Sequence, residues 1–146
     1  MKLLRYRPRS VSEACDRLKR RGFSAEEIGA TIRRAEKAGL LDDRLFAKLW
    51  ITDRLLHRPA SRKAIASELM DKGVAREVFE PLLDEAYPPA REREMAFQLA
   101  AERYARLAGL DPERRARRTA NYLARRGFPR SLAISIVRRL EEESDE

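Results

Sequence analysis

Few residues of this sequence have the types and spacing that catalysis requires. His57 is the only histidine and Cys15 is the only cysteine, and they lie far apart in the sequence. A nucleophile–base arrangement would have to use His57, which is more simply explained as a solvated side chain near the carbonyl end of a helix. No glycine-rich phosphate loop, zinc-ligand spacing or dinucleotide fingerprint is present. We therefore expect no catalytic residue, no cofactor and no enzymatic activity.

The one conspicuous pair of carboxylates is Asp42 with Asp43. A metal-dependent hydrolase could hold a divalent ion there together with Glu26 or Glu27, and its activity would appear only with added divalent ion. Carboxylates at the start of a helix also accept backbone N–H bonds and suit the positive end of the helix dipole. We favour this structural interpretation and expect no metal site.

Arginines cluster on one predicted helix near the C-terminal end of the chain. They are Arg114, Arg115, Arg117, Arg118, Arg125 and Arg126. At 100° per residue, Arg114, Arg118 and Arg125 lie within about 40° of one another, and the apolar residues lie on the opposite side. The charged face of a solvated helix normally mixes signs, whereas this helix has no acid after Glu113. The pattern favours binding of phosphates or of an acidic surface.

The predicted partner-binding or DNA-binding residues fall on two helices. They are Arg114, Arg115, Arg118, Arg125 and Arg126, with Arg33 and Arg34 as a weaker second patch. The whole chain agrees with a polyanionic partner, because 32 Lys and Arg residues outnumber 24 Asp and Glu residues and give a formal charge of +8. Since the aromatic residues are few and mostly lie on apolar faces, we expect backbone contacts rather than base stacking.

The elements that carry these side chains repeat along the chain. The pattern Leu, two residues, a basic residue, Gly and an apolar residue occurs three times, around Gly22, Gly73 and Gly127, at intervals of 51 and 54 residues. A glycine just after a helix readily adopts the left-handed conformation that ends it. Each copy therefore predicts two helices separated by a turn at the glycine. The pattern predicts helices over 10–21, 24–38, 42–57, 61–72, 75–86, 90–108, 112–126 and 129–143.

These helices predict an all-α fold, an elongated array of tandem three-helix repeats. The expected units are 1–57, 58–109 and a truncated third unit with an acidic tail, 110–146. Leu45, Phe46, Leu49, Trp50 and Leu56 predict a wide apolar face on the third helix. The expected structural repeat motif comprises Gly22, Phe23, Asp42, Asp43, Phe46, Trp50, Leu69, Lys72, Gly73, Gly127 and Phe128.

Several motifs resemble those of the RecX family, the bacterial regulators of the RecA recombinase. The matching residues are Arg9-Ser10 with Glu13, Gly22-Phe23, Gly39 to Asp43 with Phe46-Ala47, Trp50 and Arg54, Glu68-Leu69 with Lys72-Gly73-Val74, and Arg126-Gly127-Phe128. The resemblance covers almost the whole chain. It implies three-helix repeats that lodge in the groove of the RecA filament on DNA, a role in recombination, repair and the SOS response, and no catalysed reaction.

Two functions remain open at this point. The leading one is a non-enzymatic regulator that binds the RecA–DNA filament and inhibits or modulates recombinase polymerisation, ATP hydrolysis and strand exchange. The alternative is a general DNA-binding helical-repeat protein that contacts the phosphate backbone of single- or double-stranded DNA. With one cysteine and no apolar run of the roughly 20 residues that span a bilayer, we expect a cytoplasmic monomer without a membrane segment.

Overall fold

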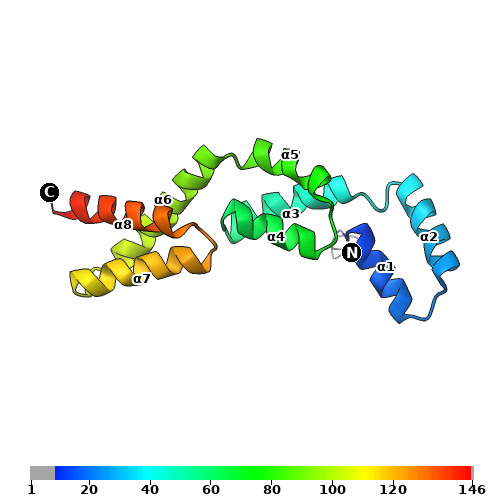
Figure 1. The fold of residues 1–146 in the computed structure, drawn as a ribbon, viewed down its shortest axis with the longest axis horizontal. Coiled ribbons are helices and arrows are strands. Elements are labelled where there is room, and N and C mark those ends of the chain that lie inside the picture. Colours follow the sequence, from blue (N-terminus) through cyan, green and yellow to red (C-terminus); the bar gives the residue numbers. More distant parts are fainter. Residues whose placement is uncertain (1–8, 146) are drawn as a thin grey trace, which may run out of the picture.

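The computed structural model describes residues 9–145, and within that range all regular structure is helical. The helices are α1 (Val11–Arg20), α2 (Ala25–Lys37), α3 (Asp43–His57), α4 (Arg62–Asp71), α5 (Arg76–Ala86), α6 (Pro89–Arg106), α7 (Pro112–Arg125) and α8 (Arg130–Ser144). They form an elongated array, with α1 and α2 at one end and α6, α7 and α8 at the other (Figure 1). The predicted all-α repeat architecture is confirmed, and each helix begins and ends within two residues of its predicted bounds.

Local capping explains where the helices begin. Ser10 and Ser24 each accept a hydrogen bond from the backbone N–H of a glutamate three residues later, and that glutamate accepts one from the serine N–H. At the start of α2, the hydrogen bonds between Glu27 and Ser24 lower the pKa of the Glu27 carboxyl. Asp42 accepts the backbone N–H groups of the second and third residues after it at the start of α3, in agreement with the structural interpretation of this carboxylate.

The repeated glycine pattern ends helices α1, α4 and α7. At the first copy, Gly22 has a φ of +89°, and the N–H groups of Gly22 and Phe23 donate to the carbonyls of Lys19 and Leu18. The same two bonds recur at Gly73 and at Gly127. This arrangement is a Schellman motif, in which the left-handed residue after the helix is glycine and the next residue is apolar. The pattern read from the sequence is therefore a helix-ending signal used three times.

The packing of the helices groups them differently from the predicted units 1–57, 58–109 and 110–146. Helix α3 packs mainly on α5 and also on α4, and one core extends from Phe46 to Tyr87. Helices α6, α7 and α8 pack on one another around a second core, from Ala96 to Leu140. The third helix of each of the first two predicted units, α3 and α6, thus packs with the pair that follows it. Helical periodicity identifies the helix pairs, but it does not show which neighbouring pair a third helix contacts.

The orientation of α3 also differs from the prediction. Its buried residues are Phe46, Ala47, Ile51 and Leu55. In contrast, Leu45, Leu49 and Leu56 are 48%, 44% and 71% exposed, and Trp50 is only partly buried. Helix α3 carries apolar residues on two sides, so the periodicity identified a broad face, and packing against α4 and α5 selected one part of it.

Phe23 does not have the environment of its counterparts. Its side chain is 46% exposed, whereas Val74 and Phe128 are 2% and 3% exposed. Helix α3 packs on α4 and α5, so within residues 9–145 it does not pack over the α1–α2 pair as a third helix. The Phe23 N–H makes the same helix-ending bond as its counterparts, and only the burial of the side chain differs.

The observed units are α1–α2 as the first, α3–α5 as the second and α6–α8 as the third. Successive units meet where the start of one helix abuts a glycine turn of the next unit. The Ser10 hydroxyl, at the start of α1, donates to the Lys72 carbonyl at 2.5 Å. The Ser61 backbone N–H, at the start of α4, donates to the Arg126 carbonyl at 3.0 Å. A Cβ atom on Gly127 would lie 2.6 Å from the Ser61 hydroxyl oxygen, closer than real Cβ contacts. The glycine is required there by its backbone conformation and by the close approach of the two units.

Candidate nucleic-acid interface

Helix α7 presents a row of exposed arginines on one side and core residues on the other. Arg114, Arg118 and Arg125, which we call the basic ridge, are all exposed, while Thr119 and Leu123 are fully buried. Arg114 forms an exposed ion pair with Asp111, the N-cap residue, with 3.7 Å between Nε and Oδ2. Exposed pairs of this kind contribute little to stability, and binding of a phosphate by Arg114 stays a prediction.

Arg115 and Arg126 have internal contacts that the sequence did not reveal. The Arg115 Nε donates to the Tyr104 carbonyl at 2.8 Å, and its guanidinium group lies 3.5 Å from the centre of the Tyr104 ring. The Arg126 Nη1 donates to the Pro59 carbonyl at 2.9 Å, and its guanidinium group lies over the Tyr122 ring. Both residues are half-buried. They hold neighbouring elements together, and their contact with a partner stays a prediction.

The second predicted patch lies at the opposite end of the molecule. Arg33 and Arg34 are exposed on α2 and line a shallow hollow with Ala30, Glu36 and Lys37. Helix α2 and helix α7 lie near opposite ends of the elongated array (Figure 1). The structure therefore does not bring the two basic patches into one site. It separates them along the long axis, as a surface that follows a polymer would require.

A further basic site lies between the second and third units. It is a hollow lined by Arg54, Arg58, Pro59, Ala60, Ala64, Glu68, Arg125 and Arg126, which we call the joint hollow. Sequence reasoning missed it because Arg54 and Arg58 are far from Arg125 in the chain. The docking of Ser61 against the Arg126 carbonyl brings these segments together. The sequence offered one partial signal, the spacing of four between Arg54 and Arg58, although Arg58 is the C-cap residue that follows α3.

The inner wall of the joint hollow is fixed by a polar network. The Arg54 Nε donates to Glu68 Oε1 at 2.9 Å, and the Arg54 Nη1 donates to the Arg58 carbonyl at 2.6 Å. The same Glu68 oxygen accepts a hydrogen bond from the Trp50 indole N–H at 3.0 Å. The Arg54 side chain is only 13% exposed. This network holds the indole N–H of Trp50, whose ring is partly buried against the core.

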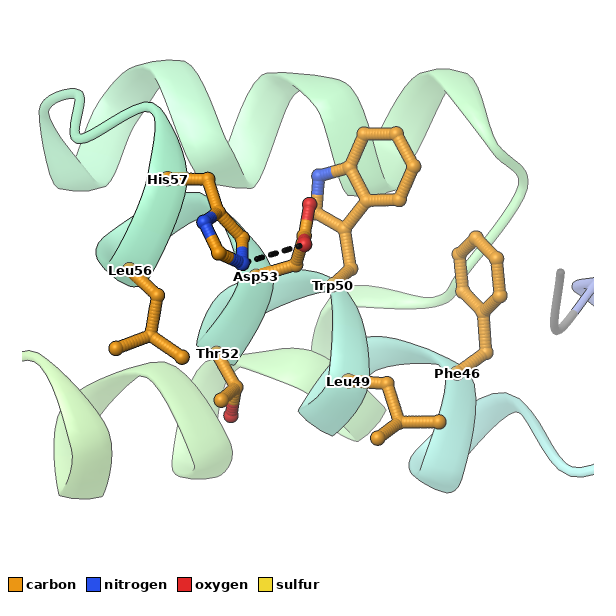
Figure 2. A pocket seen from close by; sticks show the side chains of 7 residues that line it. All are labelled: Phe46, Leu49, Trp50, Thr52, Asp53, Leu56 and His57. Carbon is orange, nitrogen blue, oxygen red and sulfur yellow. Dashed lines mark ion pairs between the residues drawn. The ribbon is translucent and has the colours of Figure 1, made fainter. Parts of the chain in front are cut away.

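The residues considered for catalysis lie in surface or structural settings. The His57 Nε2 lies 3.8 Å from Asp53 Oδ1, and both side chains are largely exposed (Figure 2). They line an open hollow of α3 together with apolar side chains such as Leu49 and Leu56. Asp43 accepts a hydrogen bond from the Val11 backbone N–H at 2.8 Å. Within residues 9–145, no three His, Cys, Asp or Glu side chains cluster closely enough to hold a metal ion.

Three family models match the chain. They are described as the first, second and third three-helix domains of RecX, and they match residues 1–34, 42–81 and 91–137. The chain belongs to the RecX family. The second match extends from the start of α3 into α5, and the third extends from within α6 into α8. These are the same groups of helices that pack around the two cores. The resemblance read from the sequence motifs is thereby confirmed.

Curated relatives agree with this assignment. The regulatory protein RecX of Thermobifida fusca is 37% identical over 147 residues, which cover all of this chain and 79% of the relative. The regulatory protein RecX of Streptomyces lividans is 33% identical and is matched over 78% of its length. The crystal structure of RecX from Lactobacillus salivarius superposes with a TM-score of 0.77 at 20% identity, over 96% of this chain and 90% of that one. That structure supports the RecX fold. None of the helices described between residues 9 and 145 has the length and apolar character of a membrane span.

Proposed function

We propose that this RecX-family chain is a non-enzymatic regulator that binds the RecA–DNA filament and inhibits recombinase polymerisation, ATP hydrolysis and strand exchange. The observation that carries the proposal is the separation of two exposed basic surfaces, on α2 and α7, along an elongated array. An extended body with basic surfaces at both ends can contact a filament at several points at once. We propose that it acts as a monomer in the cytoplasm.

The basic ridge supplies the contact with DNA in this proposal. Its guanidinium groups are exposed, and the opposite side of α7 packs on the core of the third unit. Arginine binds phosphate oxygens in pairs, and contacts of this kind position a protein on nucleic acid without reading its sequence. Such binding suits a regulator that must act wherever a filament forms.

The outer side of α3 favours a filament over bare DNA as the target. Leu45, Leu49 and Leu56 are exposed there beside the open hollow that contains Trp50. Leucine side chains form no hydrogen bond or ion pair with backbone phosphates, whereas exposed apolar patches commonly mark protein interfaces. The alternative function, a general DNA-binding protein, leaves this surface without a role.

Salt dependence distinguishes the two functions. Binding to bare single-stranded DNA should weaken steeply between about 50 and 200 mM salt, because the logarithm of the affinity falls by about 0.7 per phosphate contact for each tenfold rise in salt. Binding to a RecA filament on the same DNA should be tighter and should weaken less, since an apolar protein interface is not screened. Fluorescence anisotropy with a labelled chain measures both. Equal affinities and equal slopes would support the general DNA-binding alternative.

A further inference from the structure

We propose that the joint hollow binds one backbone phosphate of nucleic acid, held jointly by Arg58 of the second unit and Arg125 of the third. The inference rests on the proposed contact with DNA and adds a defined site to it. Arg58 is the C-cap residue of α3, and Arg125 ends α7. Both are exposed, and both line the hollow.

The charge of the joint hollow favours an anion. Four arginines line it together with a single carboxylate, Glu68. That carboxylate is already paired with Arg54. Among the residues that the structure describes, Arg58, Arg125 and Arg126 form no ion pair with an acid. Gathering unpaired positive charges in a concave site raises the local potential, and a phosphate group lowers it.

The inner wall of the site is already ordered before any ligand binds. Arg54 is held by Glu68 and by the Arg58 carbonyl, and Arg126 is held by the Pro59 carbonyl and the Tyr122 ring. A phosphate entering the hollow would therefore have to order only the side chains of Arg58 and Arg125. Ordering few side chains on binding lowers the entropic cost.

The position of the hollow favours nucleic acid over an acidic protein surface. Arg125 belongs both to the hollow and to the basic ridge, which continues along α7 through Arg118 to Arg114. At 1.5 Å per residue, the ridge extends about 16 Å along the helix axis. A row of guanidinium groups that leads into a pocket matches a chain of regularly spaced phosphates, which a nucleic-acid strand provides.

A phosphate at this site would connect two units of the array. Arg58 and Arg125 belong to different units, and the Ser61 N–H to Arg126 carbonyl bond joins those units beside the hollow. Occupation of the site should therefore hold the two units together. Hydrogen exchange at the Ser61 amide should slow when DNA binds, because opening that bond would then also require loss of the phosphate contact.

A double-mutant cycle tests the joint contact. The variants are Arg58→Gln, Arg125→Gln and the two combined, with Arg44→Gln plus Arg93→Gln as a control of equal charge on exposed positions of α3 and α6. Binding to labelled single-stranded DNA is measured from about 50 to 200 mM salt, without recombinase. Each single variant should lose about 5-fold in affinity, a value that one phosphate contact gives near 0.1 M salt.

The combined variant decides the outcome. If both arginines hold one phosphate, the combined loss should stay well below the product of the single losses, and the salt slope should fall by about 0.7, the value for one contact. Independent losses, a fall of about 1.4 in slope, or a loss no larger than that of the control would overturn the shared site. Because recombinase is absent, these results do not depend on whether the chain inhibits it.

Two further arms identify the source of the phosphate. Inorganic phosphate at the concentration of DNA phosphates should leave the midpoint of thermal unfolding of the wild-type chain unchanged, whereas DNA should raise it. An equal rise with inorganic phosphate would overturn the nucleic-acid assignment in favour of a free anion. Loss of filament binding by the combined variant with unchanged affinity for bare DNA would overturn it in favour of an acidic protein surface.

Discussion

Replacing Arg114, Arg118 and Arg125 together with alanine is expected to weaken binding to single-stranded DNA by about 100-fold near 0.1 M salt. Three lost phosphate contacts account for this, since each contributes about 0.7 to the salt slope and the slope should fall by about 2. The three side chains are exposed, and Ala is a better helix former than Arg. The midpoint of thermal unfolding should therefore change little.

A matched triple variant controls for the change in net charge. Arg17, Arg44 and Arg93 are also exposed and lie on three other helices, so their replacement by alanine removes the same charge without touching the basic ridge. This control variant should lose much less affinity for single-stranded DNA than the ridge variant, in which Arg114, Arg118 and Arg125 are all replaced by alanine. Equal losses would show that total charge, and no particular surface, determines binding. A large loss of stability in the ridge variant would show that its arginines have a structural role.

Phe46→Ala is expected to lower the free energy of unfolding of the second unit by about 3 to 5 kcal/mol. The Phe46 side chain is 2% exposed, and its ring is stacked on Trp50 with 5.8 Å between centroids. Removing it leaves a cavity in the core formed by α3, α4 and α5. Trp50 is the only tryptophan of the chain, so its fluorescence during urea denaturation reports on this unit.

Leu49→Ala is the control for Phe46→Ala on the same helix. Leu49 is 44% exposed, so its replacement should cost less than about 1 kcal/mol. Trp50→Ala should cost less than Phe46→Ala, because its ring is only partly buried at the edge of this core. Similar losses for Phe46→Ala and Leu49→Ala would contradict the orientation of α3 described above.

The helices and their ends could be predicted from the sequence because they depend on local chemistry. The serine caps at Ser10 and Ser24 and the glycine turns at Gly22, Gly73 and Gly127 each involve residues within a few positions of one another. Such interactions are encoded in short segments. The RecX motifs could be recognised for the same reason, because the repeated pattern coincides with these turns.

The grouping of helices and the orientation of α3 could not be predicted in this way. Leu45, Leu49 and Leu56 have the residue type and periodicity of a core face, yet they are exposed. Which apolar side is buried depends on α4 and α5, and the periodicity of one helix does not show which other helices it contacts. The exposed leucines acquire an interpretation only as a surface for a partner.

The candidate site could be predicted in part. Arg115 and Arg126 lie about 100° and 120° around the helix from Arg114, toward the buried Leu123, so helical geometry alone could have separated them from the basic ridge. Their actual contacts, the carbonyls of Tyr104 and Pro59, come from other helices and turns. The joint hollow depends on docking between two units, so the spacing of Arg54 and Arg58 in the sequence could not have identified it alone.

The DNA-dependent ATP hydrolysis of the cognate RecA tests most directly whether this chain regulates a recombinase filament. The chain is titrated into preformed filaments on a fixed amount of DNA. Hydrolysis should be suppressed at well below one chain per RecA, and the ridge variant should require much more protein for the same effect. A fall in hydrolysis no larger than competition for free DNA explains would contradict regulation of the filament by this chain.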